Sequence, residues 1–249
     1  MEPIPGYSRA CCMIPPIVAK EYQEKGKYET IGGLKIYVTG SPTATKALLI
    51  GYDIWGFSSQ VIQGADILAT SDKDRSYQVF MPDFFKGEPC NKAWYPPETD
   101  EQKKNLYGWF ATRTPALSAE RTPQIIKDVE AVYGKKAWGA VGFCWGGKFV
   151  SLLSGPESLF NAAAQAHPGL MDPADAEKIT IPTCVLPSTG ESVEDMDKWE
   201  NALKVEKYVK RFEQGHGWMS AKGDLEDEKC REDYGNGYRI FLAWFAKHL

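Results

Sequence analysis

The chain has 249 residues, of which 43% are hydrophobic and 25% are charged, a balance typical of globular proteins rather than disordered, collagenous or coiled-coil chains. Its 29 basic and 33 acidic residues give a formal net charge of −4, and no block of Lys and Arg stands out, so nucleic acid is not an expected partner. The unbroken apolar run 240–246 is far shorter than the roughly 20 residues that cross a membrane, and no membrane association is predicted.

The first residues and the cysteines indicate the cellular compartment of the protein. The first residues lack the basic start and apolar core of a secretory signal. The six cysteines, at positions 11, 12, 90, 144, 184 and 230, show no Cys-x-x-Cys spacing, which is typical of reduced thiols rather than a disulfide framework. The sequence therefore predicts a cytoplasmic protein, and for Cys11 and Cys12 it predicts nothing beyond buried thiols.

Strand and helix patterns alternate along the chain. Gly32-Gly33 separates two short runs, 28–31 and 34–38, which predicts a β-hairpin. Further strands are expected at 47–51, 77–81, 137–143, 162–166, 181–186 and 208–212, and helices at 58–69, 124–132, from 147, 193–203 and 233–247. This alternation predicts an α/β fold with a mainly parallel sheet covered on both faces. No linker interrupts it, so one domain over 1–249 is expected, with 1–26 as an N-terminal extension.

The segment 87–119 carries few strand or helix signals, and we expect a long loop there. Its aromatic side chains are Trp94, Tyr95, Tyr107, Trp109 and Phe110. A long loop at this place is often a binding element, so the segment is predicted to form a wall of the binding pocket; simple packing against the domain is the alternative. Arg113 is its strong candidate for binding a carboxylate.

A nucleophile motif follows the expected strand 137–143. The run Gly142-Phe143-Cys144-Trp145-Gly146-Gly147 has the strand, sharp turn and helix context of a Gly-x-nucleophile-x-Gly elbow. Small residues are needed beside the nucleophile because its backbone turns with strained angles. Cys144 is therefore the candidate nucleophile, and the helix N-terminus would favour its thiolate. A buried structural thiol is the alternative.

An elbow predicts an acid after a later strand and a histidine after the last strand. Glu191 follows the strand at 181–186, and His216 stands between two glycines after the strand at 208–212. We expect His216 to be the base, and His167 to be a loop or core histidine. Glu191 is the favoured acid by its position, while Asp195 in the same loop remains the alternative.

The oxyanion would be held by two backbone N–H groups. The elbow supplies that of Trp145, and the loop after the early strand, Gly51-Tyr52-Asp53-Ile54-Trp55-Gly56, supplies that of Ile54. Asp53 would then lie beside the nucleophile, where its carboxylate could hydrogen-bond the resting thiol. A helix cap or a solvated acid is the alternative for Asp53.

These motifs together resemble the dienelactone hydrolases, and among them the eukaryotic carboxymethylenebutenolidase-like branch. The resemblance runs from about residue 33 to the end, and its blocks are the Asp53 loop, 81–87 (Met-Pro-Asp-Phe-Phe-Lys-Gly), the Cys144 elbow, the Glu191 loop and Gly215-His216-Gly217-Trp218. It implies an α/β-hydrolase fold that hydrolyses esters and lactones with a Cys-His-Asp triad and no metal or organic cofactor. It further implies Cys144 as nucleophile, His216 as base and Asp53 as the acid that hydrogen-bonds the thiol.

The chain departs from the family pattern in two places. Glu191 stands where the family acid is usually Asp. The arginines that hold the substrate carboxylate in bacterial members are absent, and these regions offer Lys86 and the run 220–222, which ends in Lys222. We therefore expect broad activity on neutral or aromatic esters and lactones.

The substrate is predicted to be a small ester or lactone. Its contacts are predicted to come from Lys86, Arg113, Trp55 and Trp218. We expect a monomer or homodimer. The alternative functions are a ligand-binding protein without turnover and a redox sensor that uses the cysteine.

Overall fold

The computed structural model describes residues 14–72 and 76–249. Its eight-stranded sheet has the order β1-β2-β4-β3-β5-β6-β7-β8. The strands are β1 (Lys27–Ile31), β2 (Leu34–Gly40), β3 (Lys46–Gly51), β4 (Tyr77–Pro82), β5 (Ala137–Phe143), β6 (Phe160–Ala166), β7 (Thr183–Leu186) and β8 (Lys207–Val209). β2 pairs antiparallel with β1 and β4, and every other pairing is parallel. The predicted mainly parallel sheet and the hairpin at Gly32-Gly33 are confirmed.

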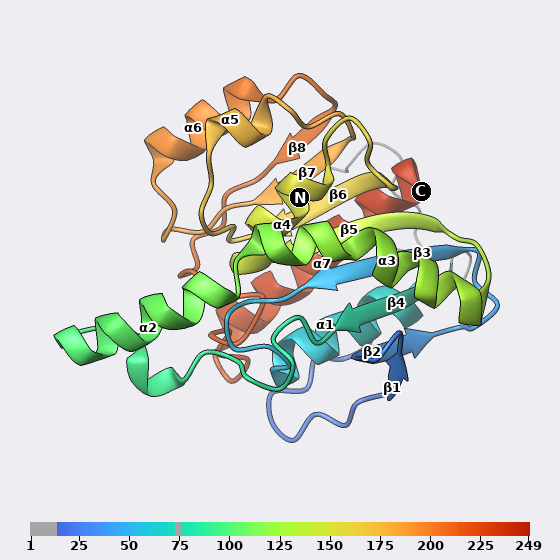
Figure 1. Cartoon of the computed structure of the whole chain (residues 1–249), viewed down its shortest axis with the longest axis horizontal. Coiled ribbons are helices and arrows are strands. Elements are labelled where there is room, and N and C mark those ends of the chain that lie inside the picture. Colours follow the sequence, from blue (N-terminus) through green and yellow to red (C-terminus); the bar gives the residue numbers. More distant parts are fainter. Residues whose placement is uncertain (1–13, 73–75) are drawn as a thin grey trace.

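Helices cover both faces of the sheet (Figure 1). α1 (Ser59–Thr70) and α7 (Glu228–His248) pack together on one face. The other face carries α3 (Pro115–Tyr133), α4 (Trp145–Leu153), the short α5 (Pro173–Ala176) and α6 (Val193–Ala202). The inner strands β3 to β7 are almost continuously buried, whereas the edge strands β1 and β8 are not, as expected where helices exclude water from both sides of the middle of a sheet.

The prediction of a long loop over 87–119 is wrong. The segment holds the short 3₁₀ helix η2 (Lys92–Trp94), α2 (Asp100–Thr112) and the first turns of α3. Thr99 and Gln102 form a capping box at the start of α2, and Thr114 caps α3. Apolar periodicity is weak because only Leu106 and Trp109 of α2 are buried; α2 projects from the body (Figure 1), so most of its surface is solvated.

Other boundaries also differ from the expected ones, among them those of α4, α7 and β8. α4 begins at Trp145, directly after the turn, and α7 begins at Glu228 because Asp227 caps it. β8 ends at Val209. The chain beyond still follows β7, since the N–H groups of Lys210 and Phe212 donate to carbonyls at positions 185 and 187.

The described part of the N-terminal extension, residues 14–26, packs along α1. Gln63 exchanges two hydrogen bonds with the Val18 backbone. The buried carboxylate of Asp66 accepts hydrogen bonds from the Tyr22 hydroxyl and the Lys25 N–H. Cys11 and Cys12 lie outside the described residues. Across the described ranges, no helix is long and apolar enough to cross a membrane.

The topology gathers the predicted motifs at one edge. The parallel strands β3, β5, β6, β7 and β8 all point the same way, so the loops that leave their carboxyl ends meet at one edge of the sheet. Ligands of open α/β sheets bind at this edge. The loops that carry Asp53, Cys144, His167, Glu191 and His216 are these loops.

Candidate functional site

Cys144 occupies a strained turn between β5 and α4. Its φ of 52° and ψ of −110° lie outside the regions that side chains usually allow. A Cβ added to Gly142 would come within 2.2 Å of the Gly146 carbonyl oxygen, and one added to Gly146 within 2.0 Å of that of Gly51. The elbow therefore needs both glycines, and it leaves Cys144 partly exposed at the head of α4.

The His216 ring lies between Cys144 and Glu191. Its Nδ1 is 2.5 Å from Oε1 of Glu191, so the other ring nitrogen, Nε2, remains for the Cys144 thiol, with which the ring interacts. Burial lowers the pKa of His216, but the interactions with Cys144 and Glu191 outweigh burial and raise the pKa to about 10. An imidazole in this position readily takes the proton of a neighbouring thiol.

The Glu191 carboxylate is fixed by its own loop. It accepts hydrogen bonds from the Ser188 N–H and, at 2.9 Å, from the Ser188 hydroxyl. The Arg211 guanidinium donates to the backbone carbonyls of Ser188 and Glu191. Burial would raise the pKa of Glu191, but the hydrogen bonds from His216 and Ser188 lower it. This carboxylate is therefore held charged, facing the imidazole.

Asp195, the alternative acid, lies elsewhere. It is exposed in the first turn of α6, where its N–H donates to the capping Ser192 hydroxyl. With Glu191, Met196 and His216 it borders a cavity of about 240 Å³ on the acid side of the imidazole. The hydrogen bond to the His216 ring comes from Glu191 and not from Asp195.

The two residues predicted to supply the oxyanion donors, Ile54 and Trp145, line the same cavity as Cys144. Trp145 is the first residue of α4, so its N–H has no partner within the helix. The Ile54 carbonyl accepts from the Cys90 N–H at 2.8 Å. In the described parts of the chain, the amides of Ile54 and Trp145 have no acceptor of their own. Both remain available to a bound oxygen.

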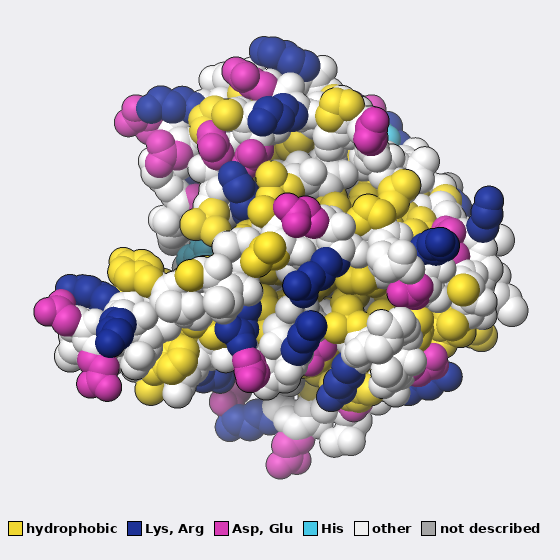
Figure 2. Space-filling model, in the orientation of Figure 1, with side chains coloured by type: hydrophobic (Ala, Val, Ile, Leu, Met, Phe, Trp, Pro, Cys, Tyr) yellow, Lys and Arg dark blue, Asp and Glu magenta, His cyan; other side chains and the backbone are white. Residues whose placement is uncertain are grey.

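A cavity of about 170 Å³ opens over Cys144. Its lining consists of Asp53, Ile54, Trp55, Tyr95, Phe110, Cys144, Trp145, Gly169, Leu170, His216, Gly217 and Lys222. Figure 2 shows the surface hollowed between α2 and α6, with histidine atoms at the bottom of the hollow. Most of this lining is aromatic, aliphatic or glycine, and its polar side chains are those of Asp53, Cys144, His216 and Lys222.

Only one of the four predicted substrate contacts lines this cavity. Trp55 lines the cavity as expected, but Lys86, Arg113 and Trp218 do not. Lys86 is exposed elsewhere, and Trp218 is buried against Phe212, with ring centroids 4.5 Å apart. The Arg113 guanidinium pairs with Glu88.

The cation that does line the cavity is Lys222. Its Nζ lies 5.3 Å from the Trp55 ring centroid and 4.5 Å from that of Tyr95, within cation–π range. Tyr95 and Phe110, from the segment 87–119, form further parts of the wall. That segment therefore contributes to the pocket, as the sequence predicted, although its conformation is helical.

His167 lies beside the site without reaching the cavity lining. It is fully buried, and its ring meets the His216 ring edge-on at a centroid distance of 5.2 Å. Burial lowers the pKa of His167 well below its ordinary value, so the ring is neutral. It packs against the His216 imidazole and adds no second positive charge.

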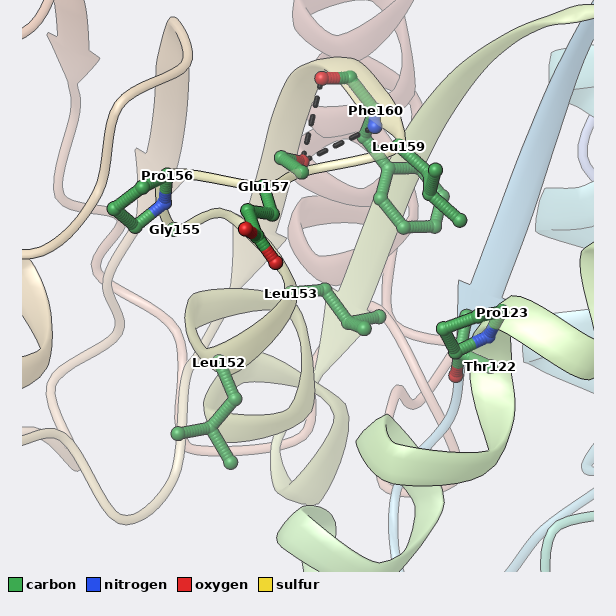
Figure 3. Close-up of a pocket in the computed structure, with 10 residues that line it drawn as sticks. Thr122, Pro123, Leu152, Leu153, Gly155, Pro156, Glu157, Leu159 and Phe160 are labelled. Atoms are coloured by element: carbon green, nitrogen blue, oxygen red, sulfur yellow. Dashed lines mark hydrogen bonds between the residues drawn. The ribbon is translucent and has the colours of Figure 1, made fainter.

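Another cavity, larger than the one over Cys144, lies away from this chemistry. A cavity of about 430 Å³ is bordered by Pro123 of α3, Leu152 and Leu153 of α4 and the turn before β6 (Figure 3). Because β6 begins at Phe160, this cavity lies near the amino ends of the strands. None of the predicted site residues borders it.

The comparisons with known proteins agree with the fold and the motifs. A model of the dienelactone hydrolase family matches residues 34–249. The chain belongs to this family. That membership confirms the resemblance, the α/β-hydrolase fold and the prediction of a hydrolase that acts on ester bonds.

Individual family relatives span nearly the whole chain. An uncharacterised AIM2-family protein of Schizosaccharomyces pombe is 36% identical and covers 91% of this chain and 92% of its own length. A human carboxymethylenebutenolidase homolog is 25% identical, covering 92% and 94%. The structure of a dienelactone hydrolase from Anabaena variabilis has a TM-score of 0.63 at 14% identity, covering 91% of this chain and 98% of that one.

Some residues of this dienelactone hydrolase-family site were missed from the sequence. Leu170 lines the cavity, and Ser188 and Arg211 hold the Glu191 loop. Leu170 lies in a loop without a motif, and Arg211 is 20 residues from Glu191. Ser188 lies only three residues before Glu191, so its closeness in the sequence could have indicated its contact with the acid. Nothing in the sequence pairs Arg211 with this loop.

Proposed function

We propose that the protein is a cysteine-dependent hydrolase of small esters or lactones, with Cys144 as nucleophile, His216 as base and Glu191 as the acid. The observation that carries the proposal is the position of the His216 ring, which is hydrogen-bonded through Nδ1 to the Glu191 carboxylate and interacts with the Cys144 thiol. A cysteine at a strained elbow beside a histidine oriented by a carboxylate is the arrangement of nucleophilic acyl transfer.

The first half of the reaction forms a thioester. The Cys144 proton passes to His216 Nε2, Sγ attacks the carbonyl carbon, and the amides of Ile54 and Trp145 stabilise the oxyanion. The C–O bond to the leaving group then breaks, and the departing oxygen takes the proton from Nε2. For a lactone the leaving hydroxyl stays attached to the acyl chain.

The second half releases the acid. A water molecule gives a proton to His216 Nε2 while its oxygen attacks the thioester carbon. The C–S bond breaks, the carboxylic acid leaves, and Sγ recovers the proton from the imidazolium. Glu191 holds the imidazolium in orientation through Nδ1 in both halves and remains charged throughout.

The cavity suits a small, partly aromatic acyl group. Its volume is about 170 Å³, below the usual range for sites that hold drug-sized ligands. Trp55, Tyr95 and Phe110 supply flat apolar walls. Lys222 in the cavity lining supports a secondary activity on esters that carry a carboxylate, and the aromatic walls favour neutral substrates.

The proposal is tested by trapping the acyl-enzyme. The purified protein is treated with an activated aryl ester or a phosphonyl probe, and the labelled peptide is mapped. We expect stoichiometric label on Cys144, loss of label in Cys144→Ala, and turnover of small esters and lactones by the wild type. Cys90 and Cys184 are buried thiols whose pKa burial raises, so they serve as internal controls.

Other outcomes would support the alternative functions. Reversible binding of an ester without an acyl-enzyme would indicate a ligand-binding protein. Oxidation of Cys144 by peroxide under conditions where no ester reacts would indicate a redox sensor. Label on Cys90 or Cys184 in preference to Cys144 would contradict the nucleophile assignment.

A further inference from the structure

The Asp53 carboxylate joins two loops that are distant in the sequence. Its side chain is 1% exposed. Oδ1 accepts a hydrogen bond from the Trp55 N–H at 2.8 Å, and Oδ2 accepts one from the Ala221 N–H at 2.9 Å. The Ser220 side chain, whose hydroxyl donates to the Gly217 carbonyl at 3.4 Å, also interacts with this carboxylate. One buried carboxylate thus holds the loop after β3 and the loop after β8 together.

The two loops carry different parts of the proposed machinery. The Ile54 amide belongs to the peptide directly after Asp53, and the Asp53 carbonyl accepts from the Gly56 N–H at 3.2 Å, which closes this turn. On the other side, tight turns connect His216 to Ala221, with Trp218 N–H donating to the Gly215 carbonyl and Ser220 N–H to that of Gly217. Holding the Ala221 amide in place therefore also holds the loop that carries His216.

The chemistry of this junction needs a carboxylate. Asp presents two acceptor oxygens, whereas Asn presents one oxygen and one NH₂ group, which would face a backbone N–H. Burial raises the pKa of Asp53, and the interactions with Ser220, Ala221 and Trp55 oppose this effect. Within the described ranges no hydrogen bond connects Asp53 to the Cys144 thiol. Both carboxylate oxygens of Asp53 instead accept hydrogen bonds from backbone N–H groups.

We propose that Asp53 is a positioning residue, which locks the loop carrying the Ile54 N–H to the loop carrying His216 so that the oxyanion donor and the base keep a constant separation. This inference rests on the proposed function. It differs from the role that the family resemblance implies, a hydrogen bond to the resting thiol. A donor displaced by about 1 Å loses much of its effect on a transition state, so the junction acts on the rate.

Hydrogen exchange measured by NMR on the full chain tests the junction itself. In Asp53→Asn we expect the Trp55 or the Ala221 amide to lose at least about tenfold of its protection, because one oxygen can accept from only one of them. The matched control is Asp66→Asn, which also removes a fully buried carboxylate that accepts several hydrogen bonds, but on α1. Unchanged protection of both amides in Asp53→Asn would overturn the proposal.

Kinetics separate positioning from an action on the thiol. In Asp53→Asn we expect kcat for a small ester to fall about 10- to 100-fold with KM changed less than about threefold. Alkylation of Cys144 by iodoacetamide depends on His216 but not on the oxyanion donors, so its rate should fall clearly less than kcat does. If alkylation and ester hydrolysis change by the same factor, Asp53 acts on the thiol and the proposal is wrong.

Two further results keep the test decisive. If Asp53→Asn does not fold, Ser220→Ala removes a side chain that interacts with the Asp53 carboxylate. This variant should lower the protection of the Ala221 amide and kcat in the same direction by a smaller factor. No effect on either would overturn the proposal. If wild-type protein hydrolyses no ester, the proposed function fails, while the exchange data still decide whether Asp53 joins the loops.

Discussion

Nδ1 of His216 and Oε1 of Glu191 lie 2.5 Å apart, and the same carboxylate is held from behind by Ser188. A glutamate reaches farther than an aspartate by one methylene, and here Arg211 holds the loop that carries it by donating to the Ser188 and Glu191 carbonyls. The imidazole is consequently oriented toward Cys144.

This contact predicts how the two candidate acids differ. Glu191→Gln should lower kcat for a small ester by about 10²- to 10⁴-fold, because the imidazolium loses its charged partner and its orientation. Asp195→Asn should change kcat by less than about threefold. Steady-state kinetics with one activated ester measures both. A larger loss in Asp195→Asn than in Glu191→Gln would transfer the role to Asp195.

Cys144 and His216 should behave as one unit. Cys144→Ala should abolish measurable turnover, with a loss of at least about a thousandfold, and His216→Ala should be nearly as damaging. The double variant should be little worse than Cys144→Ala, because either change removes the same attack. Cys230→Ala, at a buried thiol in α7, is the control. Multiplicative losses in the double variant would contradict a shared step.

The raised pKa of His216 predicts a pH dependence of stability. Because the folded pKa of about 10 exceeds the ordinary 6.5, the native state binds more protons than the unfolded state between these values. The stabilisation that His216 contributes is therefore complete below about pH 6.5 and is lost as the pH rises through about 10. The difference in unfolding free energy between wild type and His216→Gln should shrink over this range. Denaturant unfolding at pH 7, 8.5 and 10 measures it, and a constant difference would contradict the assignment.

Lys222 predicts the treatment of acidic substrates. Its ammonium lies over Trp55 and Tyr95 at the cavity, so Lys222→Met should raise KM about fivefold for esters that carry a carboxylate and leave neutral esters nearly unchanged. Lys86→Met is the matched control, since this exposed lysine does not border the cavity. An equal effect of the two substitutions, or a strong wild-type preference for dienelactone that depends on Lys86, would show that the cation was misassigned.

Much of the site followed from local patterns. The order of the proposed nucleophile, acid and histidine was visible because each of these residues follows a segment with a strand pattern. The need for Gly142 and Gly146 could be inferred, because the backbone approaches both positions too closely for any side chain. A parallel sheet then brings the carboxyl ends of β5, β7 and β8 to one edge. The sequence by itself determined the family, the sheet and the candidate residues of the elbow.

Only the tertiary structure decided which side chains face one another. Glu191 and Asp195 share a loop, and their roles separate because Ser188 and Arg211 turn one carboxylate inward while α6 carries the other into solvent. Trp218 stands two residues after His216, yet its side chain is buried in the core. Side-chain direction in loops depends on contacts between distant segments, as between Asp53 and Ala221, and no local pattern records such contacts.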